Sequence, residues 1–169
     1  MLSRLERYEV GAAANAAQPR VITANLRAID GKNHHALNGR LFNAQDMEEV
    51  AEDEVARAGA LELWEVRNES GQIHPVHIHG VQFQIVSRDT VPGAENMMYA
   101  GRANPASAFR PGFRFTRELD GGWKDTVVLA PGERARLLMR LAEPGLFLYH
   151  CHTLEHEDMG MMRNYRVKA

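Results

Sequence analysis

Short apolar runs separated by turn residues constrain most strongly what this chain can fold into. Each run has the length of a β-strand, and about seven such strands favour an all-β, Greek-key β-sandwich. The runs are Arg20 to Ile29, Leu61 to Asn68, Val76 to Arg88, Lys124 to Leu129, Glu133 to Leu141, Leu146 to His150 and Asn164 to Lys168. The breaks between them contain Gly71, Pro92, Pro131, Gly132, Pro144 and Gly145.

Two segments depart from the strand pattern inside the domain. Acidic residues begin the segment Asp46 to Ala58 and Gly59 follows it, so we predict one short helix there. The segment Thr90 to Gly122 is rich in Gly, Pro, Asn and Arg and is too long for a simple turn. We expect a long loop excursion on the surface, which either shapes a nearby site or is an ordinary solvated loop. Its candidate contact residues are Met97, Met98, Arg110, Arg114 and Arg117.

The N-terminal region lacks the apolar anchors of the rest of the chain. Gly11 to Gln18 is rich in Ala and Asn and precedes Pro19, so we predict that residues 1–20 form a leader or inter-domain linker. Residues 21–169 would then form the folded domain. A signal peptide needs an apolar stretch, whereas Met1 to Val10 contains alternating charges, so no export signal is expected.

Composition limits the kinds of partner. The chain has 169 residues and 44% hydrophobic content, which suits one packed core. Its 22 acidic and 20 basic residues are spread along the sequence, so no basic face for nucleic acid or anionic lipid is expected. No apolar run approaches the roughly 18 residues of a membrane span. We therefore expect neither nucleic acid nor membrane as a partner.

Histidine is concentrated in two short clusters. One cluster contains His74, His77 and His79, and the other contains His150, His152 and His156 around Cys151. Cys151 is the single cysteine, so the chain has no internal disulfide. An isolated His-x-His pair is usually an ordinary feature of a strand's polar face. Two such clusters together with a cysteine indicate a metal site.

On a β-strand, successive side chains point to opposite faces, so the spacing within each cluster predicts which residues share a face. His150 and His152 share one face, and Cys151 points to the other. His77 and His79 likewise share a face. His74 falls on the opposite side, although Pro75 makes the local backbone less regular. If the two strands are neighbours, four histidines meet on one side of the sheet and His74 meets Cys151 on the other.

The loop after Cys151 supplies two further ligand candidates. It carries His156 and, past Gly160, the thioether of Met161. Two imidazoles, one thiolate and a weak axial methionine form the ligand set of a blue-copper centre. Zinc competes for Cys and His ligands, but a structural zinc site does not explain Met161 or the His-x-His pairs. Because Cys151 is covalently joined to His150 and His152, an electron at its sulfur has a short through-bond route to metals on those histidines.

These motifs make the chain resemble the last domain of the multicopper oxidases, a family that includes laccases, bilirubin oxidases, bacterial spore-coat laccases and periplasmic cuprous oxidases. The resemblance covers about residues 35–168. It rests on Leu37 to Phe42, Trp64 to Asn68, His74 to Phe83, Trp123 to Thr126 and His150 to Met162. It implies a cupredoxin-like fold and a location in the periplasm or outside the cell, although the chain shows no export signal.

The resemblance also implies a role for each ligand candidate. The residues matching type 1 copper ligands are His74, Cys151, His156 and Met161. The match to a type 2 ligand is His77, and the matches to type 3 ligands are His79, His150 and His152. An axial Met161, where many fungal laccases have Leu or Phe, resembles the bacterial and bilirubin-oxidase-like members and implies a lower potential.

Two carboxylates near these clusters have two interpretations each. Glu157 matches an acidic residue thought to relay protons in similar enzymes, which with Cys151 makes it a catalytic candidate; it is otherwise a solvated loop carboxylate. Asp125 either orients a metal-bound histidine or is a turn residue.

Half of the family's three-copper cluster has no match in this sequence. The family uses eight histidines there, and four of them come from an N-terminal domain. His34 and His35 are adjacent, would face opposite sides of a strand, and are predicted to be loop residues. The type 1 site would thus be complete and the type 2/type 3 site partial. An N-terminal multicopper oxidase domain or chain, or a second copy of this chain, would have to complete it.

The predicted function is that of a copper-dependent oxidase. Single electrons would pass from a phenol, bilirubin-like pigment, aromatic amine or Cu(I) to a site that reduces dioxygen to water. As an isolated monomer the chain would be incomplete. The alternative is a one-copper electron carrier or an inactive fragment. The four histidines outside the type 1 set favour the oxidase, because a simple carrier has no use for them.

Overall fold

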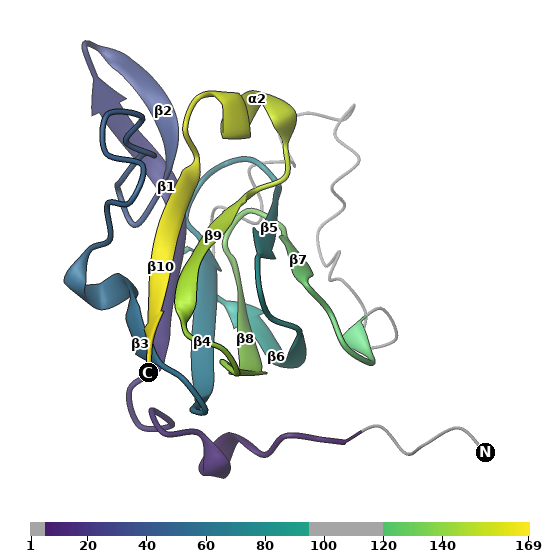
Figure 1. Ribbon diagram of the computed structural model, residues 1–169. Coiled ribbons are helices and arrows are strands. Elements are labelled where there is room, and N and C mark those ends of the chain that lie inside the picture. Colours follow the sequence, from purple (N-terminus) through teal and green to yellow (C-terminus); the bar gives the residue numbers. More distant parts are fainter. Residues whose placement is uncertain (1–5, 95–119) are drawn as a thin grey trace.

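The computed structural model describes residues 6–94 and 120–169, which form a sandwich of two β-sheets (Figure 1). Within these residues each sheet has five strands. The first sheet, in spatial order, is β2 (Lys32–Leu37), β1 (Arg20–Ile29), β4 (Leu61–Asn68), β8 (Glu133–Arg140) and β6 (Phe83–Thr90). The second is β3 (Val55–Arg57), β10 (Met162–Lys168), β9 (Gly145–Cys151), β5 (His74–Ile78) and β7 (Thr126–Leu129). The predicted Greek-key β-sandwich is confirmed.

The chain changes sheet at each step from β4 to β9, so neighbours in sequence often lie in opposite layers. The single run predicted over Val76 to Arg88 is therefore two strands, β5 and β6, in different sheets. Gly80 lies in the turn between them with φ +72°, and any side chain there would overlap the Phe147 ring.

The prediction that His34 and His35 are loop residues is wrong. Both belong to β2, which pairs with β1 in a hairpin that places His35 opposite Leu26. The two turn residues, Asp30 and Gly31, have φ values of 50° and 74°, as a type I′ turn requires. Asp-Gly between two extended segments is a strong hairpin signal, and it lies directly before β2.

The helix predicted over Asp46 to Ala58 is also wrong. That segment contains turns, the 3-10 turn η2 (Glu52–Glu54) and strand β3. Helix formation would use its backbone carbonyls internally, but the Asn164 amide donates to the carbonyls of Met47 and Glu49, both at 3.0 Å. The described α-helix is instead α2 (Leu154–Asp158), in the loop after β9.

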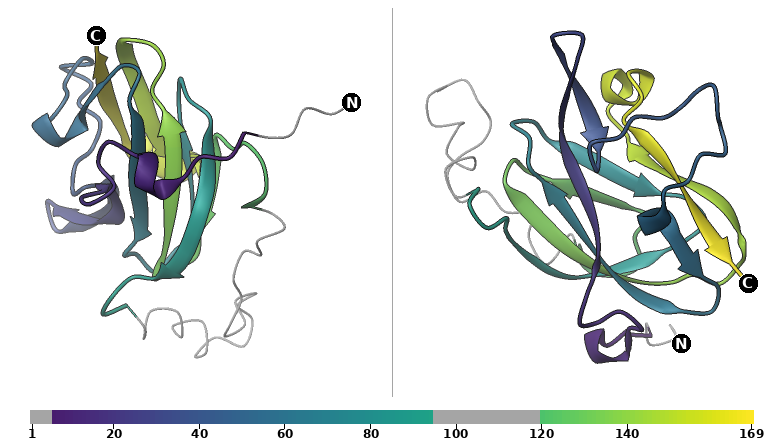
Figure 2. Two further views of the ribbon diagram at one scale, coloured as in Figure 1. Left: turned by 90° about the horizontal axis from the view of Figure 1, so that it is seen from below. Right: turned by 90° about the vertical axis from the view of Figure 1, so that its left-hand side faces the viewer.

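The N-terminal segment and α2 lie at opposite ends of the sandwich, as Figure 1 and the right-hand view of Figure 2 show. The segment contains the 3-10 turn η1 (Val10–Ala12). The Asn15 side chain donates to the Leu63 carbonyl at 2.9 Å and accepts from the Leu63 N–H at 2.7 Å, and Ala14 N–H donates to the Leu61 carbonyl. These bonds attach the segment to β4; its role as leader or linker remains a prediction.

The predicted excursion falls mostly on residues 95–119, which lie outside the described residues together with its candidate contact residues. None of the helices in the described segments has the length and apolar character to span a bilayer.

The core lies between the two sheets and extends into the second histidine cluster. Its large, almost fully buried members are Trp64, Phe83, Leu137, Tyr149 and Tyr165. Cys151 and Met161 belong to the same apolar cluster and are fully buried. The sulfur atoms predicted as ligands therefore lie in the dry interior.

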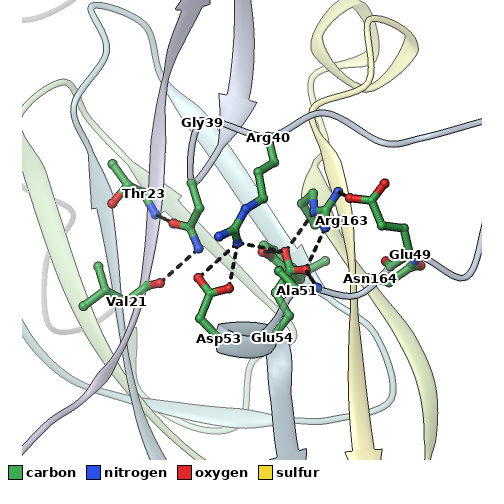
Figure 3. Close-up of polar contacts among 12 residues, drawn as sticks. Val21, Thr23, Gly39, Arg40, Glu49, Ala51, Asp53, Glu54, Arg163 and Asn164 are labelled. Atoms are coloured by element: carbon green, nitrogen blue, oxygen red, sulfur yellow. Dashed lines mark hydrogen bonds and ion pairs between the residues drawn. The ribbon is translucent and has the colours of Figure 1, made fainter.

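A buried ion pair ties the segment before β3 to β10. Arg163 donates to both carboxylate oxygens of Glu54, at 2.9 and 2.8 Å, and also to Glu49 (Figure 3). Glu54 is 3% exposed and also accepts from the Tyr149 hydroxyl at 2.8 Å. Because β10 begins directly after Met161, this network also holds the end of the loop that carries the thioether.

We expect Glu54→Gln to lower the free energy of unfolding by about 3–5 kcal/mol, because it leaves the buried Arg163 charge without its bidentate partner. Asp53→Asn is the matched control: it removes a partly exposed ion pair with Arg40 and should cost less than about 1 kcal/mol. Urea unfolding at pH 7, followed by tryptophan fluorescence, measures both. Equal stabilities of Glu54→Gln and the unsubstituted protein would contradict this account.

The same pair predicts acid sensitivity. Burial by itself raises the pKa of Glu54, but hydrogen bonds from Arg163, the Ala51 N–H and Tyr149 outweigh it, so its pKa lies below the ordinary 4.5. The stabilisation is present above about pH 4.5 and is lost as the pH falls through the folded-state pKa. Glu54→Gln should lack this part of the acid dependence.

Candidate metal centres

Pairing between β5 and β9 organises both histidine clusters. The strands are antiparallel, with Val76 opposite Cys151 and His77 opposite His150. Residues in opposite positions share a face of the sheet. Burial alternates without interruption along β5, so His74 lies on the inner face with Val76 despite the intervening Pro75. The register therefore places His74 with Cys151, and His77 with His150.

On the inner face the cysteine sulfur lies between two imidazoles. Cys151 Sγ is 3.4 Å from His74 Nδ1 and 3.6 Å from His156 Nδ1, and it accepts a hydrogen bond from the Thr153 N–H at 3.4 Å. All three ligand candidates are buried: His74 and Cys151 fully, and His156 to within 5%. The sulfur therefore has a fixed position and no contact with bulk solvent.

The loop after β9 brings His156 back to this sulfur and Met161 back to the backbone of Cys151. His156 lies on α2, and the chain reverses at Gly160, whose φ of +90° favours glycine. Met161 N–H then donates to the His156 carbonyl at 2.9 Å, and Cys151 N–H donates to the Met161 carbonyl at 3.1 Å. The structure thus brings Met161 into the same buried cluster as Cys151.

Nε2 of His74, the ring nitrogen remote from the sulfur, contacts a buried hydroxyl that fixes the tautomer of the ring. Ser70 Oγ lies 2.7 Å from His74 Nε2 and 3.0 Å from Asn68 Oδ1. The Asn68 amide nitrogen donates to two backbone carbonyls, so its oxygen must be the acceptor that faces Ser70. The Ser70 hydroxyl therefore donates to Asn68 and accepts the His74 Nε2–H, which leaves a lone pair on His74 Nδ1 beside the sulfur.

Gln72 plays the same role for His156. Its side-chain oxygen lies 2.9 Å from His156 Nε2. An amide oxygen only accepts, so the proton is on Nε2 and the lone pair of Nδ1 faces Cys151. Ser70 and Gln72 were not predicted from the sequence. The available signal was their position within the four residues before His74, where a polar side chain lies close to the predicted ligands.

Burial sets the protonation of this inner site. It lowers the pKa of His74 to about 3, with a further contribution from His156 and His35, and it lowers the pKa of His156. It also raises the pKa of the Cys151 thiol. The metal-free site is therefore neutral, with two imidazole lone pairs and one S–H. A cation that binds the thiolate must displace that proton.

The other four predicted histidines gather on the outer face. Ring centroids are 4.7 Å apart for His77 and His79, and 4.9 Å apart for His150 and His152. Nε2 atoms of His79 and His150 lie 3.0 Å apart, and ligand atoms of His77, His150 and His152 lie within 4.8 Å of one another. His79 and His152 are exposed, so this cluster opens to the surface.

Backbone and side-chain oxygens orient the outer rings. His77 Nδ1 donates to the Asp125 carbonyl at 2.9 Å, whereas the Asp125 carboxylate is 3.8 Å away. Asp125 therefore orients His77 mainly through its backbone carbonyl. This leaves the lone pair on Nε2 of His77 free to bind a metal. Glu157 Oε2 lies 3.4 Å from His150 Nδ1, so this carboxylate faces the outer cluster. Burial and the neighbouring imidazoles lower the pKa of His79.

A seventh histidine, His35, joins the inner site. Its ring centroid lies 3.9 Å from that of His156 and 5.1 Å from that of His74. The interpretation of the leftover histidines as loop residues missed it, because β2 was not predicted.

The donor atoms of the two faces suit different metals. A thiolate and imidazoles with a buried thioether match a soft, redox-active ion such as copper, and a group of imidazoles alone suits Cu, Zn or Fe. The inner set therefore fits the copper site that the sequence predicted, and the outer set also fits copper.

Comparisons with known proteins point to one family. The sequence model of the multicopper oxidase family matches residues 15–169. A laccase from Haloferax volcanii is 34% identical over 159 residues, which is 92% of this chain and 23% of that protein. The multicopper oxidase mco of Staphylococcus aureus is 31% identical over 135 residues, covering 78% of this chain and 24% of that protein.

A solved structure shows the same fold. The McoA multicopper oxidase of the hyperthermophile Aquifex aeolicus superposes with a TM-score of 0.69 and 32% sequence identity, over 99% of this chain and 32% of that chain. The chain thus spans about a quarter of the length of the curated relatives above.

Proposed function

The chain belongs to the multicopper oxidase family, and we propose that it supplies the electron-accepting copper site of such an oxidase and part of its oxygen-reducing site. Single electrons from a phenolic, pigment or cuprous substrate would enter at the inner face and serve to reduce dioxygen to water at the outer face. One observation carries the proposal. Cys151 has its sulfur between two imidazoles on the inner face, while its chain neighbours His150 and His152 lie in a histidine cluster on the outer face.

For the inner face we assign His74, Cys151, His156 and Met161 as the ligands of a type 1 copper. Copper supplies one-electron chemistry when bound, and its potential depends on the axial ligand and on the surroundings of the sulfur. The chain's own groups prepare the site: Ser70 and Gln72 hold the His74 and His156 tautomers, and the Thr153 N–H donates to the sulfur.

For the outer face we assign His77 to a type 2 copper and His79, His150 and His152 to type 3 coppers. The Asp125 carbonyl holds the proton of His77 on Nδ1, so the lone pair on Nε2 would bind the copper. Glu157 is placed to carry a proton between solvent and this face, because its partly exposed carboxylate contacts His150 Nδ1. Reduction of dioxygen to water consumes protons, and a carboxylate at this position would deliver them.

The outer site needs a partner to be complete. Four histidines are half of the family's set, and the curated relatives are about four times as long as this chain. An N-terminal multicopper oxidase domain or chain is the partner that this difference in length favours; a second copy of this chain is the other source. A one-copper carrier is the second candidate function, but the outer cluster of His77, His79, His150 and His152 favours the oxidase.

Copper loading tests the inner site. We expect one equivalent of Cu(II) to give an intense visible absorption band from the bond between the Cys151 thiolate and copper. Cys151→Ser should abolish this band. His152→Ala should keep it, because His152 is exposed on the other face. Absorption and electron paramagnetic resonance spectra measure both. A colourless copper complex of the unsubstituted chain would overturn the assignment.

Oxygen uptake tests the need for a partner. We expect the copper-loaded monomer, isolated by size exclusion, to consume no oxygen with a dye as the reducing substrate. A polypeptide that carries the family's other His-x-His pairs should restore uptake. Dye-dependent uptake by the monomer alone would contradict the assigned half-site. More than two coppers per chain in a purified dimer would identify a second copy as the partner.

The tautomer argument predicts a role for Ser70. We expect Ser70→Ala to lower copper affinity by about 10–100-fold, because the His74 Nε2–H loses the acceptor that orients the ring. Glu69→Ala is the control, since Glu69 is the exposed neighbour. Competition with a coloured chelator measures both affinities. An affinity unchanged in Ser70→Ala would show that the ring is held by packing alone.

A further inference from the structure

His35 is a buried histidine that the proposed function does not use. It lies on β2 opposite Leu26, with 9% of its surface exposed, so the first sheet supplies it, whereas His156 comes from the loop after β9. The two ring centroids are 3.9 Å apart, and the ring planes make an angle of 31°. The His35 ring therefore lies nearly flat against one face of the His156 ring.

The Nδ1 atom of His35 does not hold this ring in place. It is buried and has no hydrogen-bond partner among residues 6–94 and 120–169. Buried polar atoms nearly always have a partner, because they have given up their bonds to water. The contacts that remain for the ring of His35 are with other rings: it lies flat on His156 and approaches His74 edge-on.

The stacked ring restricts a torsion of His156 that its hydrogen bond leaves loose. Rotation about the Cβ–Cγ bond of a histidine has broad minima. Nε2 lies closer to this axis than Nδ1, so the bond to Gln72 at 2.9 Å tolerates a rotation that moves Nδ1 away from Cys151 Sγ. An edge-on contact needs more room: His35 and His74 meet at 61° with their centroids 5.1 Å apart. At 3.9 Å, rotation of His156 would push its edge into the His35 ring.

We propose that His35 is a positioning residue of the type 1 copper site, whose ring fixes the plane of His156 and keeps water from the face that it covers. This inference rests on the proposed function, in which His156 is a copper ligand. With the thiolate bound, the oxidised copper site carries one more positive charge than the reduced site, and a dry surrounding disfavours the more highly charged state. His35 therefore favours the reduced copper and raises the reduction potential.

The metal-free 169-residue chain tests the contact itself, because an aromatic ring shifts the NMR signals of protons that lie over its face. We expect the ring-proton signals of His156 to move downfield in His35→Ala and to stay upfield in His35→Phe, which keeps a flat ring. His34→Ala is the matched control on the opposite face of β2 and should leave these signals in place. Unchanged His156 signals in His35→Ala would overturn the proposal.

The copper-loaded chain tests the effect on the site. We expect His35→Ala to lower the equilibrium constant for reduction by about 3–10-fold, which is about 30–60 mV for a one-electron couple. It should also broaden the copper lines in the electron paramagnetic resonance spectrum, because the His156 ring then takes a range of angles. His35→Phe should restore both, and His34→Ala should change neither. A potential unchanged in His35→Ala, or lowered equally in His35→Ala and His35→Phe, would contradict a role for the stacked ring.

Circular dichroism shows whether each variant is folded. If the space left by His35→Ala prevents folding, His35→Gln takes its place in both measurements, since it fills more of the space without a ring. The visible thiolate-to-copper band separates this inference from the proposed function. Its absence from the unsubstituted chain would overturn the copper assignment and this inference with it. Its presence, together with a potential that does not depend on His35, would overturn this inference alone.

Discussion

The antiparallel pairing of β5 with β9 is the constraint on which both proposed metal centres depend. Its register sets Val76 opposite Cys151 and His77 opposite His150. Because side chains alternate between faces, a slip of one residue in one strand would carry its set of ligands to the wrong side. The sulfur would then face the outer cluster, and the two sites could not share one strand. Burial of Val76, Ile78 and Tyr149 opposes such a slip, since it would expose them.

Burial and hydrogen bonding then prepare the inner site before any metal arrives. The core around Cys151 keeps the thiol and its neighbouring imidazoles neutral, and Ser70 and Gln72 place each ring proton on the nitrogen remote from the sulfur. The Glu54–Arg163 pair holds the start of β10, directly after Met161. The ligand geometry is thus supported from the sheet, from the loop before His74 and from the segment before β3. In the proposed type 1 site, this support would hold the ligands in place during electron transfer.

The sequence predicted the arrangement of side chains correctly where they alternate between the two faces of a strand. Alternation along β5 and β9 predicted that His74 and Cys151 share one side while His77 and His150 share the other, and the fold has this arrangement. It failed where tertiary contacts decided the outcome: the segment Asp46 to Ala58 has acidic residues typical of a helix start, but Arg163 and Asn164 bind its carboxylates and carbonyls. His35 was missed because the Asp30-Gly31 turn before it was not used. Ser70 and Gln72 act through contacts that no spacing rule describes.

Anomalous diffraction at the copper absorption edge, from crystals of the copper-loaded chain, tests the central claim most directly. The account predicts a peak on the inner face, within bonding distance of Cys151 Sγ and of Nδ1 in both His74 and His156. Any copper on the outer face would lie on the other side of the same strand. Copper found only among His77, His79, His150 and His152, with none at the sulfur, would contradict the account.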